Sequence, residues 1–171
     1  MEKQGKRVII LIEEMYNEFE FWYPLYRLRE AGVEVVVVGS GSADIYKSKA
    51  GLPAKVDTSA DQVSGTDFDG IIIPGGYAPD HMRRCPPMVK LVKDLFEAEK
   101  VVAAICHAGW MLASAEIVEG RTVTGFFAIK DDLIHAGANY VDQEVVVDGN
   151  LITSRTPDDL PAFMRAILEA L

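Results

Sequence analysis

Runs of consecutive apolar residues alternate along the chain with segments whose apolar positions recur at helical spacing. The longest apolar runs fall at residues 7–12, 33–38, 68–73 and 101–105. Runs of this kind are typical of strands that are buried on both faces in a parallel sheet. Helical spacing predicts helices over residues 19–31, 86–99, 108–115, 129–136 and 160–171.

Shorter patterns fill the stretches between these elements. Further strand candidates lie at residues 43–46, 54–57 and 122–124, and Gly149-Asn150 joins residues 144–148 to 151–153 in a predicted hairpin. Strands that alternate with helices predict an α/β layered fold with a mostly parallel sheet, built as a single domain over residues 1–171. Ligands of such sheets bind at the carboxyl ends of the strands, near the point where the strand order reverses.

Three segments of the sequence share that predicted position. An acidic loop follows the first strand, Gly75-Gly76 follows the third, and Cys106 follows the fourth. Paired glycines allow a positive φ and a close approach of the backbone to a ligand, although a simple tight turn has the same signature. Gly39-x-Gly41 is half of a dinucleotide fingerprint, but the third glycine and the following helix are missing. We therefore predict no cofactor and no metal.

Cys106 stands where the buried strand gives way directly to helical spacing, with small residues on both sides. At such a corner the free N–H groups of the following helix face the side chain. We expect them to lower the pKa of the Cys106 thiol and so to favour a nucleophilic thiolate. A buried structural cysteine is the alternative, since free cysteines are among the most buried residues.

A thiolate nucleophile needs oxyanion donors, a base and a group that sets its charge. The backbone N–H groups of Gly76 and His107 are candidate donors, and His107 is a candidate base that lacks an orienting acid nearby in the sequence. A protonated carboxyl from the acidic loop or the helix after it could donate to sulfur. The residues alone do not choose among Glu13, Glu14, Glu18 and Glu20. His81 and His135 are alternative histidines, and Cys85 has neither a corner nor a glycine loop.

The amino-acid composition and net charge exclude some classes of binding partner. The chain has 171 residues, 49% hydrophobic and 25% charged, with a formal net charge of −9. This charge argues against nucleic acid or an anionic membrane as the main partner. The apolar run at residues 8–12 is too short for a signal peptide or a membrane span. Two cysteines are too few for a disulfide framework, so we expect a reducing cytoplasm.

Four motifs together resemble the PfpI branch of the ThiJ/PfpI superfamily, over nearly the whole chain. They are Asp69-Gly-Ile-Ile-Ile-Pro-Gly-Gly76, Ala104-Ile-Cys-His107, Glu144-Val-Val-Val-Asp-Gly-Asn150 and Ser154-Arg-Thr-Pro-Asp-Asp-Leu160. These relatives are intracellular cysteine proteases and general stress proteins, also described as protein deglycases. The resemblance implies a flavodoxin-like three-layer sandwich related to class I glutamine amidotransferases, with the cysteine on a nucleophile elbow.

The resemblance also assigns roles to particular residues. Cys106 matches the family nucleophile, His107 the histidine beside it, and Glu20 the carboxyl that contacts the cysteine. Gly76 matches the oxyanion donor. Asp80 matches an acidic residue that a neighbouring subunit offers to the histidine, which implies a homo-oligomer, either a dimer or a hexamer.

Three positions depart from patterns found among the relatives. Ala108 replaces a glycine that often follows the Cys-His pair, and Phe126 stands where some relatives carry a tyrosine near the cysteine. Asp80 is one methylene shorter than the glutamate of some relatives. The sequence therefore leaves three points open. They are the geometry of the turn after the elbow, the absence of a phenolic contact with the cysteine, and whether Asp80 reaches His107.

The sequence leads to a cysteine-dependent hydrolase of stress defence. Its substrates are glycated amines and thiols, small aldehydes or peptides, and the residues do not separate deglycase, glyoxalase and peptidase because all three need the same nucleophile. The alternative is a redox-sensing stress protein or chaperone in which Cys106 is oxidised to a sulfinate held by Glu20. Glutamine amidotransferase activity is disfavoured, because no His-x-Glu pair follows the cysteine.

Overall fold

The computed structural model describes residues 3–171, and its centre is a seven-stranded sheet in the order β10-β11-β7-β6-β1-β2-β5. The strands are β1 (Arg7–Leu11), β2 (Glu34–Gly39), β5 (Thr58–Ser59), β6 (Gly70–Ile73), β7 (Val101–Ile105), β10 (Val145–Asp148) and β11 (Leu151–Ser154). Every neighbouring pair is parallel except β10 and β11, which form the predicted hairpin.

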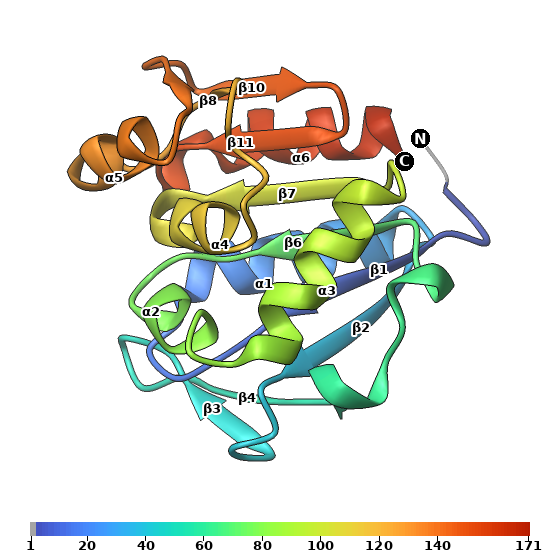
Figure 1. Ribbon diagram of the computed structural model, residues 1–171. Helices are drawn as coiled ribbons and strands as arrows, with labels where there is room; N and C mark the ends of the chain where they lie inside the picture. Colours follow the sequence, from blue (N-terminus) through green and yellow to red (C-terminus); the bar gives the residue numbers. More distant parts are fainter. Residues whose placement is uncertain (1–2) are drawn as a thin grey trace.

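Helices cover both faces of this sheet, so the molecule has three layers (Figure 1). One face carries α1 (Glu18–Glu30) and α6 (Leu160–Ala170). The other face carries α2 (Ala78–Met82), α3 (Pro86–Glu97), α4 (Gly109–Ser114) and α5 (Lys130–His135). The predicted α/β three-layer sandwich is confirmed.

Two small sheets flank the main one. Strands β3 (Ile45–Lys47) and β4 (Pro53–Lys55) pair antiparallel, and β8 (Thr122–Val123) and β9 (Asn139–Tyr140) pair parallel. The apolar pattern predicts β3, β4 and β8 but misses α2, β5 and β9. The missed elements have two to five residues and are rich in polar residues, so they carry neither an apolar run nor helical spacing.

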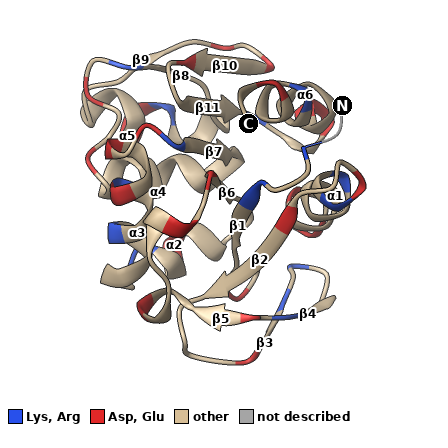
Figure 2. Cartoon of the chain, turned by 90° about the vertical axis from the view of Figure 1, so that its right-hand side faces the viewer, with Lys and Arg blue, Asp and Glu red and all other residues tan. Residues whose placement is uncertain are grey.

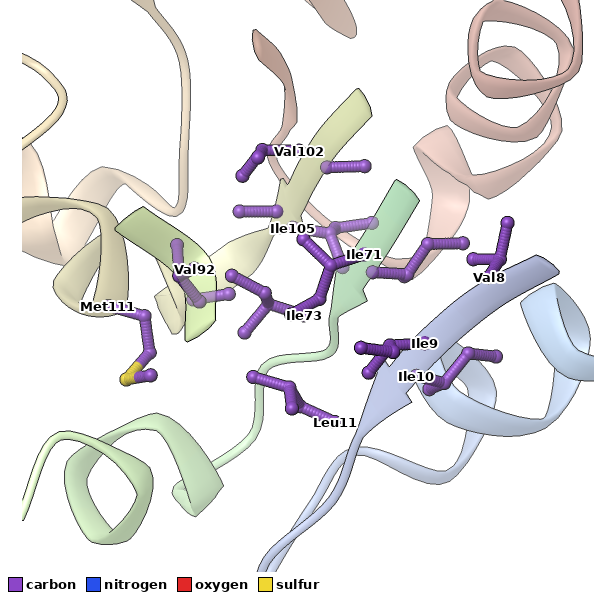
Figure 3. Close-up of a cluster of buried hydrophobic side chains, with 14 of the residues drawn as sticks. Val8, Ile9, Ile10, Leu11, Ile71, Ile73, Val92, Val102, Ile105 and Met111 are labelled. Atoms are coloured by element: carbon purple, nitrogen blue, oxygen red, sulfur yellow. The ribbon is translucent and has the colours of Figure 1, made fainter. Parts of the chain in front are cut away.

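The apolar side chains of the central strands and the helices meet in one continuous core (Figure 3). Ile9 and Ile10 from β1, Ile71 from β6 and Val102 from β7 are almost inaccessible to solvent. Burying each such side chain contributes roughly 1.5–3 kcal/mol to folding. This burial on both faces explains why the strands read as unbroken apolar runs in the sequence.

The charged side chains lie mainly on helices, loops and strand ends, and the central strands β6 and β7 carry none (Figure 2). Among the residues that the structure describes, no helix is long and apolar enough to cross a membrane. The strand order reverses beside β1, because the chain goes outward through β2 and then returns to β6 on the other side. The loops that follow β1 and β6 therefore meet at the switch point where ligands of α/β sheets bind.

Candidate active site

Three residues with a left-handed backbone gather at the carboxyl ends of the central strands. Met15 follows β1 with φ +61°, Gly76 follows β6 with φ +78°, and Cys106 follows β7 with φ +62°. A non-glycine residue in this region is uncommon and is usually held there by its surroundings. The strand-to-helix turn at Cys106 thus forms the predicted nucleophile elbow, in which the side chain is displayed at a sharp bend.

Several polar groups surround the Cys106 thiol, which is only 7% exposed. Its Sγ lies 3.3 Å from Nδ1 of His107. The backbone N–H groups of His107 and Gly76 donate hydrogen bonds toward the sulfur, which favours the thiolate. The structure therefore brings together both backbone donors that the sequence suggests.

The expectation of a lowered pKa for the Cys106 thiol is wrong. Burial, together with the charge of Glu20, raises this pKa from its ordinary value to about 12 and outweighs the two backbone donors. A 3₁₀ turn over residues 106–108 separates the thiol from α4, which begins only at Gly109. Desolvation of the anion is thus stronger here than stabilisation by the end of a short helix.

Glu20 is fully buried in the first turns of α1 and approaches the same thiol. The N–H of Gly75 donates to its Oε2 at 2.7 Å, while Oε1 has no hydrogen-bond partner among the described residues. Burial raises the pKa of the Glu20 carboxyl from 4.5 to about 7, against the lowering effect of the Gly75 N–H. A protonated Glu20 removes the negative charge beside Cys106, so the thiolate is favoured in that state.

Of the other acidic residues near the first strand, Glu13 and Glu14 have hydrogen-bond partners of their own, and Glu18 lies in a separate pocket. Glu13 is buried and accepts hydrogen bonds from the N–H of Glu14 and the hydroxyl of Ser42. Glu14 accepts the N–H of Lys47. Glu20 is therefore the carboxyl that the fold directs to the cysteine, a choice that the residues alone leave open.

Position 75 requires glycine, because the space beside its backbone is filled by Glu20 and Cys106. A Cβ at this position would lie 2.5 Å from Oε2 of Glu20 and 2.8 Å from Cβ of Cys106. Real Cβ atoms do not approach other atoms so closely, so a side chain here would push the carboxyl and the nucleophile apart. The two glycines therefore differ in role. The N–H of Gly76 donates to the Cys106 sulfur, and the absence of a side chain at Gly75 lets Glu20 and Cys106 lie close together.

His107 is half-buried and its ring is held by aromatic neighbours. The ring centroid lies 4.7 Å from that of Phe126 and 5.2 Å from that of Trp110. The indole N–H of Trp110 donates in turn to Asp132 at 2.7 Å. Burial and the charge of Lys49 lower the pKa of His107, so its imidazole is neutral at pH 7 and can accept a proton. Phe126 packs against this ring and offers no hydroxyl.

Asp80 lies on α2 and forms an ion pair with Arg84. Within the described part of the chain, no hydrogen bond or ion pair joins Asp80 to His107. Its predicted role from a neighbouring subunit stays a prediction.

The alternative histidines and cysteine lie in other settings. His81 packs its ring against Tyr77, and His135 occupies the last turn of α5. Cys85 is half-buried at the start of α3, where its thiol lies 3.8 Å from the carbonyl of Ser40. None of these residues takes part in the arrangement around Cys106.

A pocket of about 380 Å³ opens over Cys106 and His107. It is lined by Met15, Asn17, Lys49, Gly76, Tyr77, Cys106, His107, Trp110, Phe126 and Pro157. Lys49 and Trp110 are not predicted from the sequence, because no motif marks Lys49 and the apolar character of Trp110 is typical of a core residue. In residues 3–171, no three His, Cys, Asp or Glu side chains are grouped in a way that could hold a metal ion.

The parallel sheet, the cysteine elbow and the buried carboxyl beside it define a class of α/β proteins with a reactive-cysteine site. Residues 6–170 match the DJ-1/PfpI family, and the chain belongs to that family.

Individual relatives agree with this assignment. The chain is 38% identical over 165 residues to deglycase PfpI of Pyrococcus furiosus, covering 96% of this chain and 99% of the relative. It is 39% identical over 169 residues to general stress protein 18 of Bacillus subtilis, covering 98% of each chain. A two-domain protein from Anabaena variabilis with DJ-1/ThiJ/PfpI-like and ferritin-like domains superimposes with a TM-score of 0.95 and 46% identity. That match covers 96% of this chain and 48% of the two-domain protein.

Proposed function

We propose that this protein is a cysteine-dependent hydrolase of stress defence that removes glyoxal or methylglyoxal adducts from thiols and amines. The observation that carries the proposal is the setting of Cys106, whose sulfur lies 3.3 Å from a histidine nitrogen and faces two backbone N–H groups. A nucleophile, a base and oxyanion donors are thereby gathered at one pocket. The deglycase name of the Pyrococcus furiosus relative supports the same class of substrate.

The chemistry can be written for a methylglyoxal hemithioacetal. Nδ1 of His107 takes the thiol proton of Cys106, and the sulfur bonds to the aldehyde-derived carbon while the original thiol leaves with that proton. The proton on this carbon then moves to the neighbouring ketone carbon, and the hydroxyl proton moves to the former ketone oxygen, which yields a lactoyl thioester on Cys106. Water hydrolyses the thioester to lactate and restores the thiol. One carbon is oxidised and its neighbour is reduced, so no external oxidant is needed.

The remaining site residues have distinct tasks in this scheme. The N–H groups of Gly76 and His107 stabilise negative charge on the reacting oxygen. Glu20 in its protonated form keeps a second anion away from the thiolate, and its pKa of about 7 makes this form available at neutral pH. We further propose that Asp80 of the partner subunit orients His107 in a homo-oligomer.

The size of the pocket favours small adducts over peptides. A volume of about 380 Å³ is in the range of small-molecule sites. An extended peptide would need a longer groove, with backbone partners on both sides of the scissile bond. Deglycation is therefore the activity that the site supports best among those that share this nucleophile.

The experiment compares three substrates at pH 7 with the wild-type protein and Cys106→Ser. The substrates are the hemithioacetal of methylglyoxal with N-acetylcysteine, free methylglyoxal and a fluorogenic peptide. We expect the wild type to release lactate fastest from the hemithioacetal and the variant to give only the background rate. Peptide cleavage without lactate formation would contradict the proposal. Absence of all turnover, with selective addition of two oxygens at Cys106 under mild peroxide, would support the redox-sensing alternative instead.

A further inference from the structure

Lys49 gives the pocket over Cys106 a charge that the proposed reaction does not use. Among the described residues that line this pocket, Lys49 is the one side chain charged at neutral pH. His107 is neutral there because burial lowers its pKa, and Glu20 lies beneath the lining rather than in it. A cation at this position contrasts with the net charge of −9 of the whole chain.

The backbone around Lys49 is fixed to the same frame as the oxyanion donor. The N–H of Lys49 donates to the carbonyl of Tyr16 at 3.0 Å, and Tyr16 forms isolated bridges to both Ser48 and Gly76. The hydroxyl of the buried Ser48 accepts the N–H of Leu52 at 3.0 Å and closes the turn. The start of the Lys49 side chain is therefore held at a constant place relative to Gly76.

The ammonium group itself is left free for a ligand. Within residues 3–171, Lys49 forms no ion pair, and the same is true of Lys55, whereas Lys6 binds a carboxylate. Its charge also acts on the reacting groups, since it favours the ionised form of Glu20 and the neutral form of His107. Lys49 is exposed to solvent where it lines the pocket, so its attraction for an anion is that of a partly screened surface charge held beside the nucleophile.

We infer that Lys49 is a specificity-determining residue that binds an anionic group, such as a carboxylate, on the molecule that carries the adduct. This inference rests on the proposed function and adds a substrate class to it. The preferred substrates are adducts on small carriers with a free carboxylate close to the modified thiol or amine. Adducts on neutral carriers react at the same nucleophile but lack the contact with the ammonium group.

The test uses two hemithioacetals of methylglyoxal that differ in one group. N-acetylcysteine supplies a carboxylate, and N-acetylcysteine amide supplies a neutral amide of almost the same shape. The measured quantity is the ratio of kcat/KM for the anionic substrate to that for the neutral one. We expect a ratio of about three to ten for the wild type, which corresponds to one partly screened ion pair. The ratio should shrink as salt is raised, because ions screen the attraction.

Three variants assign this preference to the pocket. Lys49→Met should reduce the ratio to about one, and Lys49→Arg should retain most of it. Lys55→Met is the matched control, because it removes the same charge from an exposed position on β4 outside the pocket lining, and it should keep the wild-type ratio. A general loss of activity or stability affects both substrates and cancels in the ratio.

The outcomes separate this inference from the function on which it rests. Equal ratios for the wild type and Lys49→Met, with both substrates turned over, would overturn the role of Lys49 and leave the hydrolase intact. Absence of turnover of either hemithioacetal by the wild type would overturn the proposed function and the inference with it. A fall of the ratio in Lys49→Met but not in Lys55→Met supports the inference.

Discussion

The backbone N–H of Gly75 and the carboxyl of Glu20 form a 2.7 Å hydrogen bond in the interior of the protein. The bond joins the end of β6 to the first turns of α1, across the switch point of the sheet. It anchors one carboxyl oxygen and leaves Oε1 without a partner on the described chain. Glu20 is therefore placed beside Cys106 by the fold itself, and its protonation governs the charge of the site.

Glu20 should make stability depend on pH. Its folded pKa of about 7 lies above the ordinary value of 4.5, so the folded protein binds this proton more tightly than the unfolded chain does. The contribution is full below about pH 4.5 and is lost as the pH rises through 7. A shift of this size corresponds to about 3 kcal/mol.

Comparison with Glu20→Gln isolates this contribution from the other titrating groups. We expect the free energy of unfolding of the wild type, relative to the variant, to fall by about 3 kcal/mol between pH 4.5 and pH 8. Urea unfolding at the two pH values measures the difference. A difference between the two proteins that does not change with pH would show that Glu20 titrates normally.

The same substitution should make the cysteine more reactive in alkaline solution. Above pH 7 the ionised Glu20 raises the pKa of the Cys106 thiol, and glutamine removes that charge. We expect iodoacetamide to alkylate Cys106 several-fold faster in Glu20→Gln at pH 8.5, with both proteins carrying Cys85→Ser so that one thiol reacts. Slower alkylation of the variant would contradict this account of the site, because it would mean that Glu20 stays protonated at pH 8.5 and stabilises the thiolate by a hydrogen bond.

Gly75→Ala should damage the site more than the fold. The new Cβ would lie within 3 Å of both Glu20 and Cys106, and a displacement of about 1 Å at reacting groups costs roughly a hundredfold in rate. Overpacking of this kind destabilises by about 1–3 kcal/mol. Turnover of the hemithioacetal and thermal unfolding measure the two effects.

Gly120→Ala serves as the control for a glycine substitution. Gly120 has φ +71° with no atom within 4 Å of an added Cβ, so it should lose stability without losing rate. An equal loss of kcat in the two variants would contradict the claim that a side chain at position 75 displaces Glu20 and Cys106.

Most of the fold could be predicted from the sequence, because the central strands are buried on both faces and appear as long apolar runs. Val101–Ile105 is buried throughout and reads as an unbroken apolar run, whereas β9 has two residues and gives no periodic signal. The motifs likewise mark Cys106 and Gly76.

The pKa of the Cys106 thiol could not be predicted from the sequence, because it depends on opposing effects of burial, neighbouring charge and backbone donors. The position of Cys106 before a helix suggests a lowered pKa, but burial and the charge of Glu20 depend on segments far away in the chain and reverse the result. Lys49 is missed for a related reason, since only the backbone contact with Tyr16 brings it to the pocket. Long-range packing decides both points.

The role of Cys106 as the nucleophile is tested most directly by comparing Cys106→Ser with Cys85→Ser in turnover of the N-acetylcysteine hemithioacetal. The two variants make the same chemical change, but Cys106 stands at the elbow and Cys85 lies outside the pocket. We expect background lactate formation for Cys106→Ser and the wild-type rate for Cys85→Ser. A wild-type rate for Cys106→Ser would contradict this role of Cys106.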